Sequence, residues 1–261
     1  MGAINKFKEF VKVFLLLISF IIILNKIAVI TGTIIHVYLF MFIVAMYVLN
    51  KFNIYKMPEM FRIYNKDFKV TFILCFFISL AQIFSFKFIY PSMYSNINLY
   101  FNNIIWGLIW LQILNCVIEE IFFRGYVLQV LNKTFTNKER LFISVIIFAI
   151  YHVIMYDVSS IKQMLLLIIF TGSAGLCLGY VYMKTENLLP SILIHMAYNI
   201  SQNIIALEFN IVNLGFKNMY IQFMYPATIF LLSLLIYIFY NKVNLKRQPT
   251  DSISSNDDIS T

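Results

Sequence analysis

The sequence predicts an all-α, polytopic integral membrane protein with about eight transmembrane helices, and three observations lead to this prediction. Of the 261 residues, 61% are hydrophobic and only 12% are charged, with a mean hydropathy of +0.81. Soluble domains carry about 25% charged residues. The apolar residues form long runs, as a helix needs in order to cross a hydrocarbon core roughly 30 Å thick. The basic residues gather in short clusters between these runs, which is typical of membrane loops.

The predicted spans lie near residues 10–25, 27–49, 70–88, 104–123, 141–156, 163–183, 188–206 and 220–240. Eight spans place both chain ends on one side of the membrane. On that side the loops and ends hold 16 Lys and Arg residues, against four on the other. An excess of Lys and Arg marks cytoplasmic segments, so we expect both termini inside (N-in, C-in).

Four regions follow from this reading. Residues 1–100 hold the N-terminal transmembrane helices and a cytoplasmic amphipathic loop, and residues 101–206 form a membrane core with polar motifs. Residues 207–241 form the last transmembrane helix, and the Ser- and Asp-rich residues 242–261 form a disordered cytoplasmic tail. The net charge of +8 belongs to the loops, so we expect no nucleic-acid partner.

Two adjacent carboxylates, Glu119 and Glu120, interrupt the apolar run 104–123. An ionisable side chain inside a membrane is costly and is therefore a functional hypothesis by default. Arg124 follows Glu120 by four residues, with the acid first, which is the better order for a helical ion pair. Glu119 lies about 100° further around the helix and has no such ion-pair partner. We expect Glu120 to be structural and Glu119 to be free to act.

Polar partners for Glu119 are expected from other spans. His152 lies four residues after Phe148, and Asn199 lies four residues after His195. At a rise of about 1.5 Å per residue, Glu119, His152 and His195 all fall in the middle or cytoplasmic half of the bilayer. We therefore expect them to share one buried chamber.

Such a chamber suits the hydrolysis of a peptide bond. A carboxylate and an imidazole together deprotonate water, and a second imidazole and an amide stabilise an oxyanion. The set Glu119, His152 and His195 also matches the His₂Glu ligands of catalytic zinc. No HExxH motif is present. We expect no tightly bound zinc, although zinc with these three ligands stays open.

Three motifs stand in order on separate predicted spans: Glu119-Glu120-x-x-x-Arg124, Phe148-x-x-x-His152 and His195-x-x-x-Asn199. They resemble the motifs of the CPBP family, the CAAX proteases and bacteriocin-processing enzymes, also called the ABI family of intramembrane endopeptidases. The resemblance covers about Ile104 to Ile205. It implies that Glu119 activates water with His152, and that His195 and Asn199 stabilise the oxyanion. Glu120, Arg124 and Phe148 would support the architecture.

The resemblance implies an endopeptidase in the bilayer that cleaves a membrane-associated or exported peptide or protein, in the manner of bacteriocin processing or self-immunity. We expect a multi-pass protein of a bacterial cytoplasmic membrane. Two other functions remain open. One is a non-catalytic immunity or regulatory scaffold. The other is a proton-coupled transporter, which the lack of an inverted repeat disfavours.

Overall fold

The computed structural model describes residues 65–89, 103–132, 135–156, 158–208 and 219–246, together with isolated residues between 4 and 22. Every regular element in these ranges is a helix, which confirms the all-α prediction for this part of the chain. The second predicted span, residues 51–64 of the amphipathic loop and residues 247–261 of the tail lie outside the described residues. The elements in chain order are α4 (Asn65–Ile89), α5 (Asn103–Glu120), the π-helix η2 (Ile121–Val127), α6 (Leu128–Asn132), α7 (Asn137–Met155), α8 (Ile161–Thr185), α9 (Leu188–Glu208) and α10 (Met219–Lys246).

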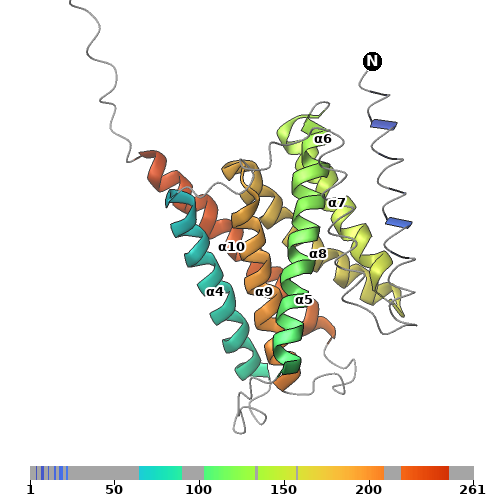
Figure 1. Ribbon diagram of the computed structural model, residues 1–261, viewed down its shortest axis with the longest axis vertical. Coiled ribbons are helices and arrows are strands. Elements are labelled where there is room, and N and C mark those ends of the chain that lie inside the picture. The colour runs from blue at the N-terminus through green and yellow to red at the C-terminus, as the bar shows by residue number, and fades with distance from the viewer. Residues whose placement is uncertain are drawn as a thin grey trace, which may run out of the picture.

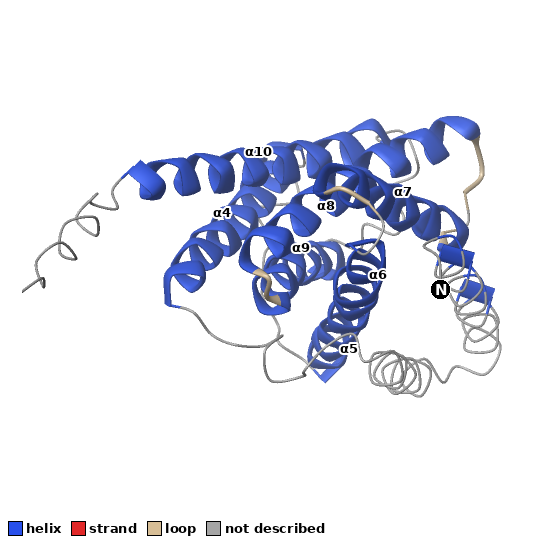
Figure 2. Cartoon of the chain, turned by 90° about the horizontal axis from the view of Figure 1, so that it is seen from above, coloured by secondary structure: helices blue, strands red, loops and turns tan. Residues whose placement is uncertain are grey.

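Helix α9 occupies the middle of the bundle. It packs against α4, α5 and α8, while α7 and α10 pack against α8. Figure 1 shows α4, α9 and α5 running side by side, and Figure 2 shows from above how α10 and α7 close the far side. The three motifs lie on α5, α7 and α9, so this packing brings them to one place.

The helix that carries the two glutamates continues well beyond the predicted span end at residue 123. After α5 it widens into a seven-residue π-helix and then returns to α-geometry in α6. All seven π-helical residues are buried, including Arg124. The predicted span ends one residue before Arg124, and this boundary is wrong, because the helix continues and keeps Arg124 in the core. Single-turn π segments are rare and often mark functional sites.

Local sequence signals set the ends of α7 and α8. Thr136 forms a capping box with Glu139 at the start of α7, and the Ser160 hydroxyl accepts a hydrogen bond from the backbone N–H of Gln163 at the start of α8. Such caps satisfy N–H groups that the first helical turn leaves without partners. Helix α8 ends at Glu186 in a left-handed conformation with φ of 51°. These caps agree with the predicted starts of both spans to within a few residues.

Glycines on α8 allow α7 to approach closely. A Cβ on Gly175 would lie 3.2 Å from the ring of Phe148, and one on Gly179 would lie 2.7 Å from the Leu141 side chain. Small residues at membrane helix interfaces permit such close packing. Gly175 therefore fixes the position of Phe148, one turn before His152.

The outward faces of the bundle are apolar. On α7 the exposed large side chains recur at four-residue spacing, which marks a continuous stripe along one helix face. An exposed apolar surface of this kind suits contact with lipid. Among the described residues, α8 is the one helix long and apolar enough to span a membrane by length and composition, with shorter apolar stretches at Phe68–Phe84 and Tyr225–Phe239. The exposed stripe of α7 consists of Phe142, Ile146, Ile150 and Ile154.

Candidate active site

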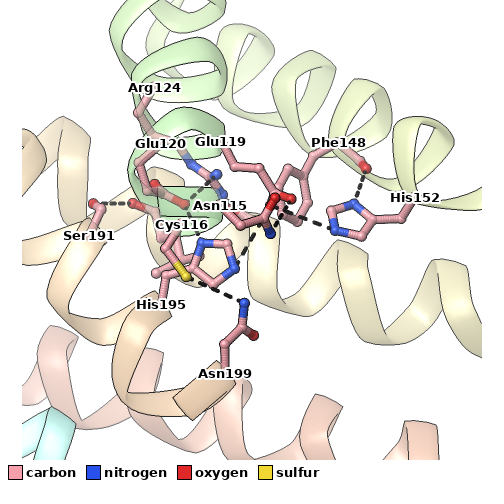
Figure 3. A network of polar contacts seen from close by, with 12 residues as sticks. Asn115, Cys116, Glu119, Glu120, Arg124, Phe148, His152, Ser191, His195 and Asn199 are labelled. Atoms are coloured by element: carbon pink, nitrogen blue, oxygen red, sulfur yellow. Dashed lines mark hydrogen bonds and ion pairs between the residues drawn. The ribbon is translucent and has the colours of Figure 1, made fainter. Parts of the chain in front are cut away.

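Glu119 lies at the end of α5 with 6% of its surface exposed. Its Oε1 accepts a hydrogen bond of 3.0 Å from Nδ2 of Asn115, one turn earlier on the same helix. Its Oε2 is buried and has no hydrogen-bond partner among the described residues. One oxygen of the carboxylate is thus anchored, and the other lies toward His152 and His195, as Figure 3 shows.

Glu120 connects two other elements to α5. Its Oε1 accepts from Nη1 of Arg124 at 2.8 Å, which confirms the predicted i, i+4 ion pair. The same oxygen also lies 2.9 Å from Nδ1 of His195 on α9. Because an ionised carboxylate paired with arginine only accepts, Nδ1 of His195 must carry the hydrogen. Glu120 therefore positions His195, in addition to its ion pair with Arg124.

His152 is held by its own helix. Its Nδ1 lies 2.8 Å from the backbone carbonyl of Phe148, and since a carbonyl only accepts, this nitrogen also carries the hydrogen. The rings of Phe148 and His152 pack at a centroid distance of 4.3 Å. The neutral imidazole then presents the lone pair of Nε2 to the chamber.

Both imidazoles point these lone pairs at the same carboxylate oxygen. The distance from Glu119 Oε2 to Nε2 is 3.8 Å for His152 and 3.8 Å for His195. This is too long for a direct hydrogen bond, yet two atoms at this separation can share one water placed about 2.8 Å from each. With neutral imidazoles, the charges of Glu119, Glu120 and Arg124 sum to −1. The Glu119 carboxylate is the unpaired charge, and it can accept a proton from that water.

Arg124 joins α5 to the α7–α8 interface. Its guanidinium carbon lies 4.6 Å from the centre of the Phe148 ring, and Nη2 donates to the backbone carbonyl of Gly175 at 3.4 Å. A cation over an aromatic face is attracted by the ring. Phe148 therefore packs between the motif arginine and His152, and its supporting role stays a prediction.

Asn199 lies one turn from His195 on α9, but its amide is engaged elsewhere. Nδ2 donates to the thiol sulfur of Cys116 at 3.4 Å, and among the described residues Asn199 makes no hydrogen bond to Glu119 or to the imidazoles. Cys116 and Glu120 are i and i+4 on α5. Two side-chain hydrogen bonds one turn apart therefore connect α5 to α9: Asn199 to Cys116 and His195 to Glu120. The shared oxyanion role of His195 and Asn199 stays a prediction.

Three contacts of the site escaped the sequence reasoning: Asn115 to Glu119, Glu120 to His195, and Asn199 to Cys116. The first carried a usable signal, because Asn115 precedes Glu119 by four residues. The other two join residues more than 70 positions apart, and no spacing rule predicts them.

The His₂Glu set also bears on a metal. Both imidazoles fix Nδ1 on an acceptor and leave Nε2 as a ligand, which is the usual arrangement of zinc-binding histidines. However, in the part of the chain that the structure describes, no three His, Cys, Asp or Glu side chains are arranged so that they could hold a metal ion. The side chains of Glu119, His152, His195 and Asn199 are therefore the groups considered for the chemistry of the site.

The site coincides with a recognised family domain. Residues 101–201 match the family model described as type II CAAX prenyl endopeptidase Rce1-like. No curated protein matches the chain at a significant level. The matched range contains all seven motif residues, on α5, η2, α7 and α9. Over residues 101–201 the chain is therefore similar to the CAAX prenyl endopeptidases that this family model describes.

Proposed function

We propose that this protein is an intramembrane endopeptidase that hydrolyses a peptide bond with a water activated by Glu119. The observation that carries the proposal is the convergence, among the described residues, of two imidazole nitrogens on one carboxylate oxygen. Glu119 Oε2 has no hydrogen-bond partner, and Nε2 of His152 and Nε2 of His195 both lie 3.8 Å from it. A buried carboxylate oxygen without a hydrogen-bond donor, next to an arginine that is already paired with Glu120, is arranged to receive a proton from water.

In the first step, Glu119 takes one proton from water while the water oxygen attacks the carbonyl carbon of the scissile bond. His152 accepts the second hydrogen bond of the water and so orients its lone pair. A positioned general base contributes about 10²- to 10⁴-fold to a rate. The proton on Glu119 then passes to the leaving amine as the C–N bond breaks, which restores the carboxylate.

The negative charge on the carbonyl oxygen needs donors. We assign these to His195 and Asn199. For this role His195 takes up a second proton from solvent before the reaction, so that Nε2 of the imidazolium donates and Glu120 stabilises the charge through Nδ1. Asn199 has a second amide hydrogen besides the one on the Cys116 sulfur. Two donors aimed at a developing oxyanion in a site without bulk water are worth several kcal/mol each.

The proposed substrate is a peptide segment at or in the membrane, because the site lies between helices with apolar outer faces. The matched family description names prenylated CAAX proteins, so a C-terminal Cys-aliphatic-aliphatic-X segment is the first candidate. An exported or bacteriocin-type peptide is the second. A farnesylated peptide and its unmodified twin distinguish recognition of the prenyl group from recognition of the peptide alone.

The test uses the purified full-length protein in liposomes with both peptides, and it detects new peptide ends by mass spectrometry. We expect wild-type cleavage of at least one peptide. Glu119→Ala and His152→Ala each should lower the rate at least about 100-fold while both proteins accumulate normally in the membrane. Wild-type rates in both variants would overturn the proposal.

A further inference from the structure

Among the described residues, Asn115 is the side chain outside the three motifs that donates a hydrogen bond to the proposed base. Its Nδ2 donates to Glu119 Oε1 at 3.0 Å, and the orientation follows because a carboxylate oxygen repels the amide oxygen. We infer that Asn115 is a positioning residue that sets the rotation of the Glu119 carboxylate, so that Oε2 faces the reacting water. The inference rests on the proposed function of Glu119.

The first argument comes from the two oxygens of Glu119. A glutamate side chain turns freely about its last bond, because that torsion is broad and roughly two-fold. Among the described residues, Oε1 has one hydrogen-bond donor, Asn115, and Oε2 has none. The bond to Asn115 therefore decides which oxygen lies 3.8 Å from both imidazole nitrogens. Without this bond the carboxylate has no donor to hold it in the chamber.

The second argument excludes the ordinary structural role of such a residue. A polar side chain in a membrane helix usually stabilises the bundle by bonding to a neighbouring helix. The bond of Asn115 runs along its own helix to residue i+4, so it joins no two helices. The Asn115 amide therefore makes no hydrogen bond between described helices. Its hydrogen bond to Glu119 is the role that remains for it.

The third argument is that the neighbouring donors bond to Glu120 and the backbone instead of Glu119. Arg124 Nη1 and His195 Nδ1 both bond to Oε1 of Glu120, and the second guanidinium nitrogen bonds to Gly175. These three nitrogens donate to the neighbouring carboxylate and the backbone, not to Glu119. Asn115 is thus the described residue that supplies Glu119 with a hydrogen bond from an uncharged group and leaves its negative charge for the proton of water.

The test compares kcat and KM of the full-length protein in liposomes, with the peptide that the wild type cleaves. Asn115→Leu keeps the approximate shape without a donor, and Asn115→Ala is a second, smaller variant that favours the helix. We expect kcat to fall by roughly 10- to 100-fold, the scale of a misplaced catalytic group, while KM stays within about threefold. Asn115→Gln retains an amide that can reach residue i+4, and it should restore at least about a third of the wild-type kcat.

The matched control is Gln112→Leu, the same loss of an amide on the same helix. Gln112 is half-buried and makes no hydrogen bond or ion pair with another described residue. We expect this variant to keep the wild-type kcat and thermal midpoint. A wild-type kcat in Asn115→Leu and Asn115→Ala would overturn the inference and leave the function of Glu119 standing. A loss that Asn115→Gln fails to restore, with a lowered thermal midpoint in all three variants, would make Asn115 merely structural. No cleavage by the wild type would overturn the proposed function itself.

Discussion

Glu120 Oε1 accepts hydrogen bonds from an arginine of its own helix and from a histidine of α9, at 2.8 and 2.9 Å. The carboxylate is fully buried, and Arg124 has only 1% of its surface exposed. Burial of a single charge costs far more than burial of a satisfied pair. One oxygen atom of Glu120 thus both pairs with Arg124 and positions His195. Substitutions can separate the effect on stability from the effect on cleavage.

Glu120→Leu should lower the free energy of unfolding by about 3–5 kcal/mol, because it leaves the guanidinium of Arg124 buried without its partner. The double variant Glu120→Leu/Arg124→Leu should recover most of that loss, since an apolar pair replaces the ion pair. Cleavage should stay low in both, because His195 has lost the acceptor of Nδ1. Thermal unfolding in detergent and the peptide assay measure the two effects. A double variant with wild-type cleavage would show that Glu120 has no task beyond the ion pair.

At the scale of the element, the close contact of α7 with α8 holds His152 at the site. Gly175→Ala should shift Phe148, because the added Cβ lies 3.2 Å from the ring and 3.6 Å from the Val145 backbone. The ring also packs against Arg124 and cannot move freely. We expect a loss of about 1–3 kcal/mol in the free energy of unfolding and slower cleavage.

Gly172→Ala is the matched control for this substitution. It adds the same methyl group to the same helix, where the nearest atom is Val145 Cγ1 at 3.9 Å, an ordinary contact. We expect this variant to keep the stability and activity of the wild type. Equal effects of the two substitutions would show that α7 does not depend on the space above Gly175.

The first turn of α7 carries a pH-dependent contribution to stability. The backbone N–H and hydroxyl of Thr136 both donate to Glu139 Oε2 at 2.8 Å, and these bonds hold the pKa of Glu139 below its usual range. A carboxyl with a lowered pKa stabilises the folded state above its ordinary pKa of about 4.3. That contribution is lost as the pH falls through the lower pKa of the folded state.

Thr136→Ala should therefore lower the thermal midpoint by roughly 2–4 °C at pH 7, with a smaller difference from the wild type near pH 3. Ser160→Ala removes the cap of α8, which has no acidic partner, so its effect should not change over this range. Thermal unfolding from pH 7 to pH 3 measures both variants. A Thr136→Ala effect that does not depend on pH would contradict the capping-box account.

The six long helices are readable from the sequence because each coincides with an apolar run whose ends carry caps or polar residues. The pairing of Glu120 with Arg124 is readable because it lies within one helix. The π-helix is not, since no propensity distinguishes a widened turn from an α-turn, and this turn keeps Arg124 buried beyond the predicted end of the span. The bond from Glu120 to His195 depends on how α5 meets α9, which tertiary packing decides.

For the whole molecule, the orientation in the bilayer stays a prediction, and the two ends of α7 provide a test of it. Lys138 and Ser159 are exposed at opposite ends of this helix. Single cysteines at these positions should react with a membrane-impermeant maleimide from opposite sides, with Ser159→Cys labelled on intact cells and Lys138→Cys only after permeabilisation. The unsubstituted protein is the control, because its three cysteines lie within helices. The reverse labelling pattern would contradict the N-in, C-in topology.

The bundle as a whole serves to place a carboxylate, two imidazoles and an amide in one apolar surrounding, and the central claim is that Glu119 is the base. The most direct measurement is the single-turnover rate of peptide cleavage by Glu119→Gln, with a zinc chelator added to the wild type in parallel. The amide has nearly the shape of the carboxylate but cannot accept the proton of water. We predict a fall of about 10²- to 10⁴-fold for the variant and an unchanged rate for the wild type with chelator. A Glu119→Gln rate close to that of the wild type would contradict the account.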